Sequence, residues 1–233
     1  MDMKVLVAEQ EWLAALANVP LWVPPKRPTI VVSPHPDDET LGAGGLIAYQ
    51  RLQGVPVWVI AVTDGEAAYK DYDNLGSIRQ SEQNQALKQL NVESDKIIRL
   101  HLPDSRVSEH ECELEETLIS LVKTGSLVVA PWKRDFHPDH EACGRAAERL
   151  VEIDDVTLVS YVFWTWHHGT TSLVTDQLPR RLQLDQSLQV AKNAALACHQ
   201  SQLKYDKESP ILPEELLGPA RRNYEIFFVP GVF

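Results

Sequence analysis

Residues 29–53 read TIVVSPHPDDETLGAGGLIAYQRLQ, and this stretch decides the fold class. It opens with an apolar, β-branched run at Thr29–Ser33, which is typical of a buried strand. Helical spacing of apolar residues follows at Leu41–Gln53. A buried strand that leads through a short polar turn into a helix is how a βαβ unit begins.

The same alternation continues along the chain. Further predicted strands are Val55–Thr63, Lys96–Leu102, Ser126–Pro131 and Val156–Trp164, and the helices between them are Ser77–Leu90 (with Ser77 as N-cap), 109–123 and His140–Val151. Strands that alternate with helices predict an α/β fold, a mostly parallel sheet with helices on both faces.

After Trp164 the rhythm changes. Two short strands at Arg181–Leu184 and Tyr224–Pro230, a helix at Gln186–Gln202 and a loop at Ser209–Pro219 are predicted. Because no long linker divides the chain, we expect residues 1–233 to form one domain, with a core at about 28–202 and a small C-terminal extension at about 203–233.

Composition excludes several classes of protein. The 233 residues contain 22 Lys plus Arg against 33 Asp plus Glu, so the net charge is −11. An acidic chain of this kind repels nucleic acid and anionic membranes. No apolar run is long enough to span a bilayer, Met1–Pro20 lacks the pattern expected of a secretory signal, and three cysteines are too few and too scattered for a disulfide scaffold. We therefore predict a cytoplasmic protein that acts on a small molecule; a homo-oligomer is compatible with the sequence.

Histidines and carboxylates follow several predicted strands. The segments are Pro34–Glu39 after the first strand, Asp64–Glu66 after the second, Pro103–Asp104 after the third and Arg134–His140 after the fourth. The carboxyl ends of parallel strands meet at one edge of the sheet, where ligands bind. Like charges crowded together there need a shared cation. We therefore favour a metal site over the alternative that Asp37 and Asp38 only cap a helix.

The residue types fit catalytic zinc, which has three protein ligands and one open position. His35 and Asp38 can point at one ion, and His140 or His137 can supply the third ligand. Asp37 is then suited to take a proton from metal-bound water, and the histidine that is not a ligand can stabilise the developing oxyanion. Metal ligands, a base and an oxyanion-stabilising histidine are together the groups needed for metal-assisted hydrolysis of an amide or ester.

These residues resemble the motifs of the PIG-L/LmbE-like N-deacetylases. The matching motifs are HPDDETLGAGG (35–45), VTDGE (62–66), Arg79-x-x-Glu82, LPD (102–104), DFHPDH (135–140) and Lys192-x-x-Ala195-x-x-x-His199-x-Ser201-Gln202. The resemblance implies a Rossmann-like fold and a zinc-dependent hydrolase that removes acetyl from an N-acetylglucosamine-type sugar conjugate. Fe²⁺ or another divalent cation could replace zinc.

The resemblance also implies roles for single residues. His35, Asp38 and His140 would bind the metal, Asp37 would be the general base, and His137 would stabilise the tetrahedral intermediate. Arg79 and Asp104 match positions near the substrate.

Four weaker predictions stand beside these. Glu39 and Asp64 are candidates to bind sugar hydroxyls, although Glu39 could be a solvated residue at the helix start and Asp64 could close a turn with Gly65. Asp135 could orient His137 by accepting its ring proton. The glycines of 42–45 would let the first helix pack closely on the sheet.

Three alternative functions stay open. The same site could hydrolyse another acylated amine or an ester. A dinucleotide-binding oxidoreductase is disfavoured because Ile47 stands where the third glycine of GxGxxG belongs. A non-catalytic metal-binding module is disfavoured because the proposed base and both histidines of the second motif are intact.

Overall fold

A five-stranded parallel sheet forms the centre of the protein, in a computed structural model that describes residues 6–205 and 209–229. The strand order is β3-β2-β1-β4-β5, and every neighbouring pair is parallel. The strands are β1 (Thr29–Ser33), β2 (Val57–Ala61), β3 (Ile97–Arg99), β4 (Leu127–Pro131) and β5 (Thr157–Tyr161). The predicted fold class, an α/β parallel sheet with helices on both faces, is confirmed.

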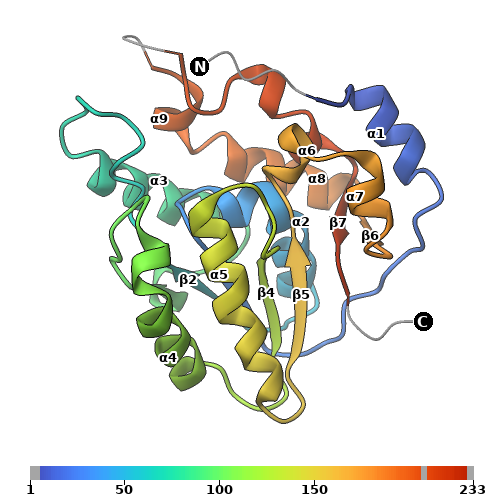
Figure 1. Ribbon diagram of the computed structural model, residues 1–233, viewed down its shortest axis with the longest axis horizontal. Helices are drawn as coiled ribbons and strands as arrows, with labels where there is room; N and C mark the ends of the chain where they lie inside the picture. The colour runs from blue at the N-terminus through green and yellow to red at the C-terminus, as the bar shows by residue number, and fades with distance from the viewer. Residues whose placement is uncertain (1–5, 206–208, 230–233) are drawn as a thin grey trace.

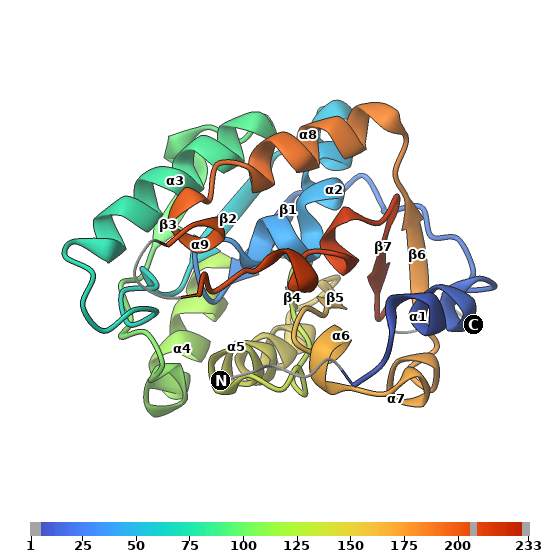
Figure 2. The ribbon, with the colours of Figure 1, turned by 90° about the horizontal axis from the view of Figure 1, so that it is seen from above.

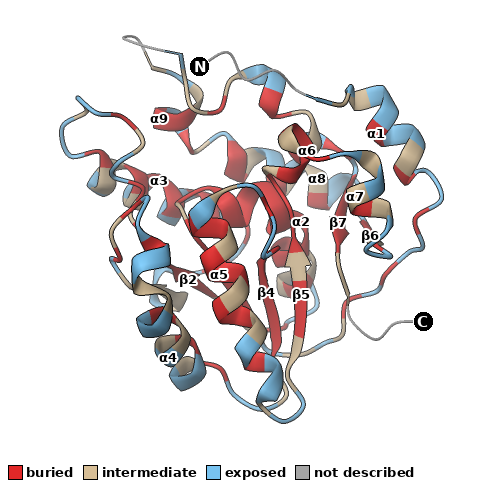
Figure 3. Ribbon diagram, in the orientation of Figure 1, coloured by how far each residue is buried: buried red, intermediate tan, exposed pale blue. Residues whose placement is uncertain are grey.

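Helices cover the sheet in two layers (Figures 1 and 2). One layer contains α2 (Asp38–Leu52), α3 (Leu75–Gln89) and α8 (Gln186–Leu196), and the other contains α4 (Glu111–Leu121) and α5 (Pro138–Glu148). Side chains alternate across each strand, so Val31 packs under the first layer and Val32 under the second. Figure 3 shows that α2 is buried over most of its length, whereas α4 has an exposed outer face.

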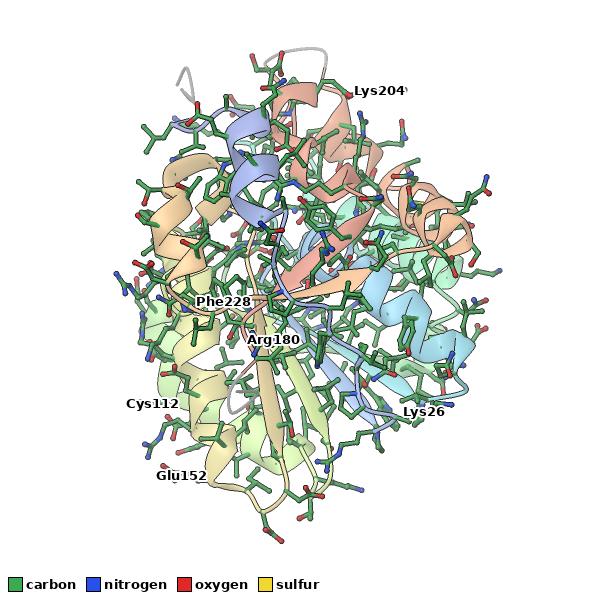
Figure 4. All side chains as sticks on the ribbon, turned by 90° about the vertical axis from the view of Figure 1, so that its right-hand side faces the viewer. Lys26, Cys112, Glu152, Arg180, Lys204 and Phe228 are labelled. Carbon is green, nitrogen blue, oxygen red and sulfur yellow. The ribbon has the colours of Figure 1, made fainter. Side chains whose placement is uncertain are left out.

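A second, two-stranded sheet lies beside the first. Its strands β6 (Arg180–Gln183) and β7 (Tyr224–Phe227) are antiparallel. Phe228, labelled in Figure 4, continues from β7 and forms a bridge with Ser160 of β5. The remaining α-helices are α1 (Glu9–Leu16), α6 (Thr165–His168), α7 (Thr171–Thr175) and α9 (Gln200–Leu203), and short 3₁₀ turns lie at Ser94–Lys96, Val107–His110, Arg149–Glu152, Glu214–Leu216 and Pro219–Arg221.

Two details of the predicted helices are wrong. Ser77 is not an N-cap, because α3 already begins at Leu75 after Asn74 in a left-handed conformation. The helix expected at Gln186–Gln202 is two helices, because α8 ends at Leu196 and α9 begins at Gln200. The intervening turn directs side chains of the segment toward α2 and α3, as described below. The predicted last strand ends at Phe227, and its expected final residue, Pro230, lies outside the described residues.

The three cysteines are free thiols, as predicted: Cys112, labelled in Figure 4, is exposed on α4, Cys143 is buried and Cys198 is half-buried. Within residues 6–205 and 209–229, no helix has the length and apolar character needed to cross a membrane.

Candidate active site

The turn between β1 and α2 places three of the predicted site residues at the carboxyl end of the sheet. His35, Asp37 and Asp38 lie where β1 ends, and α2 begins at Asp38. The turn is held by backbone hydrogen bonds from the Asp37 and Asp38 N–H groups to the His35 carbonyl. His137 and His140 come from the start of α5, which follows the neighbouring strand β4.

His35, Asp38 and His140 converge on one point. Oδ2 of Asp38 lies 3.0 Å from Nδ1 of His35 and 3.1 Å from Nε2 of His140. Zinc bound tetrahedrally at about 2.1 Å holds its N and O ligand atoms about 3.4 Å apart, a few tenths of an ångström more than these separations. Nitrogen atoms of His35, His137 and His140 also lie within 4.8 Å of one another, so a third imidazole borders the same point.

The buried Nε2 of His140 shows that these residues fit a metal ion. This atom has no hydrogen-bond partner, although it lies 3.1 Å from the Asp38 carboxylate. A buried nitrogen without a partner is costly unless something satisfies it. A divalent cation between His35, Asp38 and His140 would do so with ligand types that zinc accepts.

Two further carboxylates hold the histidine rings. Asp135 Oδ2 lies 2.9 Å from Nδ1 of His140, and Asp139 Oδ2 lies 3.1 Å from Nε2 of His35. Both aspartates are fully buried. Asp135 also accepts the Thr165 hydroxyl and backbone N–H, and Asp139 accepts backbone N–H groups from the loop before α4. Such contacts would fix which ring nitrogen faces a bound metal ion.

These contacts correct one prediction and add a residue. Asp135 contacts His140, not His137 as expected. Asp139 was not singled out in the sequence, although it lies inside the HPDH motif; its partners Ser105 and Val107 are more than thirty positions away and become neighbours only in the fold.

Asp37 is buried beside Arg79. The guanidinium donates to Asp37 Oδ2 at 3.1 Å and to the Gly65 carbonyl at 2.9 Å. Burial raises the pKa of Asp37 to about 7, while the positive charge of Arg79 opposes this rise. Arg79 therefore orients the Asp37 carboxylate, in addition to lining the cavity as a predicted substrate-binding residue.

Charge around His35, Asp38 and His140 is balanced by the same contacts. Burial lowers the pKa of His140, but the Asp38 and Asp135 carboxylates outweigh it and raise this pKa to about 9. The pKa of Asp38 lies well below its usual range because His140 and His35 outweigh the effect of burial. Without a cation, protonated imidazoles would balance the negative charge of the carboxylates here. A bound metal ion would supply this positive charge instead, and the imidazoles that bind it would be neutral.

His137 has a different environment from His35 and His140. Its Nδ1 accepts the Asp139 N–H at 3.2 Å, so its proton lies on Nε2. The ring stacks on Trp164 at 5.7 Å between centroids. Burial, with the positive charges of His35 and His140, lowers the pKa of His137 to about 4. The ring is therefore a neutral hydrogen-bond donor beside His35 and His140.

A cavity of about 230 Å³ opens onto these groups. Its polar wall contains His35, Asp37, Asp38, Arg79, Asp104, Ser105 and His137, and its apolar wall contains Leu41, Ala68, Phe163, Trp164, Ile211 and Leu212. A concave site with an apolar wall and a few convergent polar groups is the usual form of a small-molecule site.

The predicted substrate-binding residues separate into two groups. Asp104 lines the cavity, with Oδ1 at 3.2 Å from His35 Nε2; burial opposes its ionisation, but His35 and the Ala67 N–H lower the pKa of Asp104 to about 2. Glu39 is fully buried outside the cavity lining and accepts from Ser33, so the interpretation as a solvated residue is wrong. Asp64 also lies outside the lining and pairs with His101 at 2.7 Å.

The chain is similar in sequence to known proteins. The family model described as "PIG-L: GlcNAc-PI de-N-acetylase" matches residues 30–151. A "Probable N-acetyl-alpha-D-glucosaminyl L-malate deacetylase 2" of Bacillus subtilis is 30% identical over 135 residues, which are 54% of this chain and 61% of the relative. The match therefore spans about three fifths of that relative's length.

Solved structures show the same fold. The conserved protein TT1542 from Thermus thermophilus has a TM-score of 0.66 at 24% identity, covering 88% of this chain and 94% of that one. The N,N'-diacetylchitobiose deacetylase from Pyrococcus horikoshii has a TM-score of 0.58 at 23% identity, covering 76% and 71%. Because the family model matches more than half of the residues, including both histidine motifs, the chain belongs to the PIG-L family.

Proposed function

We propose that this protein is a metal-dependent hydrolase that removes the acetyl group from an N-acetylglucosamine-type sugar conjugate. The observation that carries the proposal is the placement of Asp37 and His137 in one cavity with His35 and Asp38. A base, an oxyanion donor and a ligand cluster thus face the same space. The names of the family and of the Bacillus subtilis relative support the substrate class.

His35, Asp38 and His140 would hold the cation, with zinc as the proposed metal. When bound, a divalent cation supplies Lewis-acid polarisation of the amide carbonyl and lowers the pKa of water. Asp135 and Asp139 keep the histidine rings in the orientation that this binding requires.

Asp37 and His137 carry out the proton and charge steps. Asp37 takes a proton from the water that attacks the acetyl carbon. The Nε2–H of His137 donates a hydrogen bond to the oxygen that becomes negative, because its Nδ1 is already engaged by Asp139. As the C–N bond breaks, Asp37 returns the proton to the leaving nitrogen, which gives a free amine and acetic acid, and the acid then ionises to acetate.

The apolar wall of the cavity restricts which groups can be attached to the sugar of the substrate. Ile211 is fixed there by its backbone N–H, which donates to the Tyr69 hydroxyl at 2.9 Å. Carboxylates placed against Ile211 and Leu212, and near ionised Asp104, would lose hydration and meet like charge. We therefore propose an uncharged, partly apolar aglycone, with Arg79 and Asp104 near the sugar.

Another acylated amine or an ester remains the second candidate substrate, because the groups around the proposed metal are common to these hydrolyses. A dinucleotide cradle is not supported, because Cβ atoms on Gly42, Gly44 and Gly45 would meet Tyr161, Lys192 and Leu184 instead of open space. One domain over residues 1–233, a cytoplasmic location and the oligomeric state stay predictions.

The test is acetate release from N-acetylglucosamine conjugates by zinc-loaded protein. The panel contains methyl and phenyl glycosides, the malate conjugate and an N-acetylated amine without a sugar. We expect release from the glycosides, with phenyl preferred over malate. Release only from the sugar-free amine would overturn the sugar assignment, and a preference for malate would overturn the apolar aglycone. No release from protein that binds zinc would favour a non-catalytic metal-binding module.

A further inference from the structure

The late motif from Lys192 to Gln202 takes no part in the cavity, yet its polar side chains are buried. Lys192 and its partner Glu225 of β7 are 3% and 4% exposed. Nζ of Lys192 lies 2.6 Å from Oε1 of Glu225. A buried ion pair far from solvent is costly to form, and its retention calls for a specific reason.

The ion pair forms hydrogen bonds with the backbone of α2. Lys192 Nζ donates to the Leu41 carbonyl at 3.0 Å. Glu225 accepts the backbone N–H groups of Gly45 and Leu46 at 2.7 and 2.8 Å. Three backbone groups of one helix are thus bound by two oppositely charged side chains from α8 and β7, which fixes the position of α2 along its axis and in rotation.

The glycine cluster makes room for this contact. A Cβ on Gly44 would lie 3.2 Å from Cγ of Lys192, and one on Gly45 would lie 3.0 Å from Cδ of Glu225 and 2.5 Å from Leu184. These two glycines therefore admit the ion pair, whereas Gly42, as expected, allows close packing on the sheet, against Tyr161 of β5.

Other residues of the late motif bind the same region of the site. His199 Nε2 lies 3.3 Å from the Thr40 hydroxyl in the first turn of α2. Ser201 donates through its N–H and hydroxyl to the Glu82 carboxylate, at 2.7 Å each. Glu82 lies one helical turn after Arg79, which orients Asp37.

We propose that the Lys192–Glu225 ion pair positions the Asp37–Asp38 turn through α2, so that both are positioning residues for the reaction. This role rests on the proposed function of that turn. Leu41, which Lys192 binds, lies in the first turn of the helix that begins at Asp38 and also lines the cavity. A shift of this turn would move the base and a metal ligand together.

The test removes both charges with side chains of similar size, by combining Lys192→Met and Glu225→Gln in one chain. Zinc affinity by chelator competition, kcat and KM are measured at a temperature where circular dichroism shows the protein folded. We expect kcat to fall about 10-fold or more with KM within about threefold, and zinc to bind about 10-fold more weakly.

A second ion pair with a buried cation gives the control. Arg222 is buried and pairs at 2.7 Å with Glu9 of α1, whose side chain is 35% exposed. The variant Glu9→Gln with Arg222→Met should lose stability while kcat and zinc affinity stay within about twofold of wild type. Equal losses of kcat and zinc affinity in both double variants would overturn the proposal, as would wild-type values in the folded Lys192/Glu225 variant.

The variant Gly44→Ala provides a second test in case the double variant does not fold. Its methyl group displaces the Lys192 stem by a few tenths of an ångström. Because alanine favours the helix, we expect unchanged or higher stability with reduced kcat and zinc affinity. Unchanged kcat and zinc affinity would overturn the positioning role. If wild-type protein releases no acetate, the proposed function fails, and the zinc affinities alone decide the positioning role.

Discussion

The two helical layers of this protein place their charges differently. On the α4–α5 face, Arg145 pairs with Glu111 and Arg149 with Glu115 at half-exposed positions. On the α2–α8 face, Lys192 and Glu225 are buried and bind the helix that carries Asp38. Surface pairs contribute little to stability, whereas a buried pair specifies one arrangement at a cost in desolvation. The buried ion pair therefore holds α2, the helix that begins at Asp38, whereas the pairs between α4 and α5 are partly exposed.

The largest effect is expected at the proposed metal ligands and the proposed base. Asp38→Ala and His140→Ala should lose zinc, measured as bound metal per chain after dialysis. Asp37→Asn should retain zinc and lose about 10²–10⁴-fold in kcat, because it removes the base without removing a ligand. The same kind of change on the other face, Glu111→Gln, should leave zinc content and kcat unchanged. Retained zinc in both ligand variants would contradict the assigned metal site.

The next effect compares one lost cation in each layer. Lys192→Met leaves Glu225 charged and buried, so the free energy of unfolding should fall by about 3 kcal/mol or more. Arg145→Met, whose partner Glu111 can be solvated, should cost at most about 1 kcal/mol. Urea unfolding of the two variants measures both values. Equal losses would remove the distinction between the layers.

A smaller effect is expected from acid. Burial, followed by the charge of Arg79, lowers the pKa of His199 from 6.5 to about 3. Below about pH 6.5, His199 binds a proton in the unfolded chain but not in the folded chain. Its contribution to stability is therefore complete above that pH and falls toward pH 3 by up to about 1.4 kcal/mol per pH unit. Urea unfolding should show that His199→Gln loses roughly 2 kcal/mol less than wild type between about pH 7 and 4.5. Parallel pH profiles would show that His199 is not buried in the neutral form.

The smallest effect concerns salt. Replacing both Arg149 and Glu115 by Gln should change the free energy of unfolding by about 0.5 kcal/mol or less, and that difference should disappear at about 1 M NaCl. The loss in Lys192→Met should persist at the same ionic strength, because buried charges are screened little. A salt-sensitive Lys192 effect would mean that water reaches the pair.

Local pattern was sufficient for much of the fold and for the centre of the site. The β-branched run at Thr29–Ser33 and the turn after it predicted both β1 and the convergence of His35 and Asp38. These features depend on short spacings and on the rule that strand ends meet at one edge of a parallel sheet.

Contacts between distant segments could not be predicted in this way. Asp139 reaches His35 across 104 positions, and Lys192 reaches Glu225 across 33. The break between α8 and α9 likewise depends on the contacts of His199 with Thr40 and of Ser201 with Glu82. A helical pattern in the sequence does not reveal such a break, because tertiary hydrogen bonds override local propensity.

The most direct test of the central claim compares wild-type protein with Asp37→Asn on the preferred N-acetylglucosamine conjugate, both loaded with zinc. Acetate and free amine are measured together. We predict equal amounts of the two products from wild type, and turnover lower by about 10²–10⁴-fold in Asp37→Asn at the same zinc content. Equal rates from the two proteins would contradict the role of Asp37 as the base, and with it the proposed hydrolytic site.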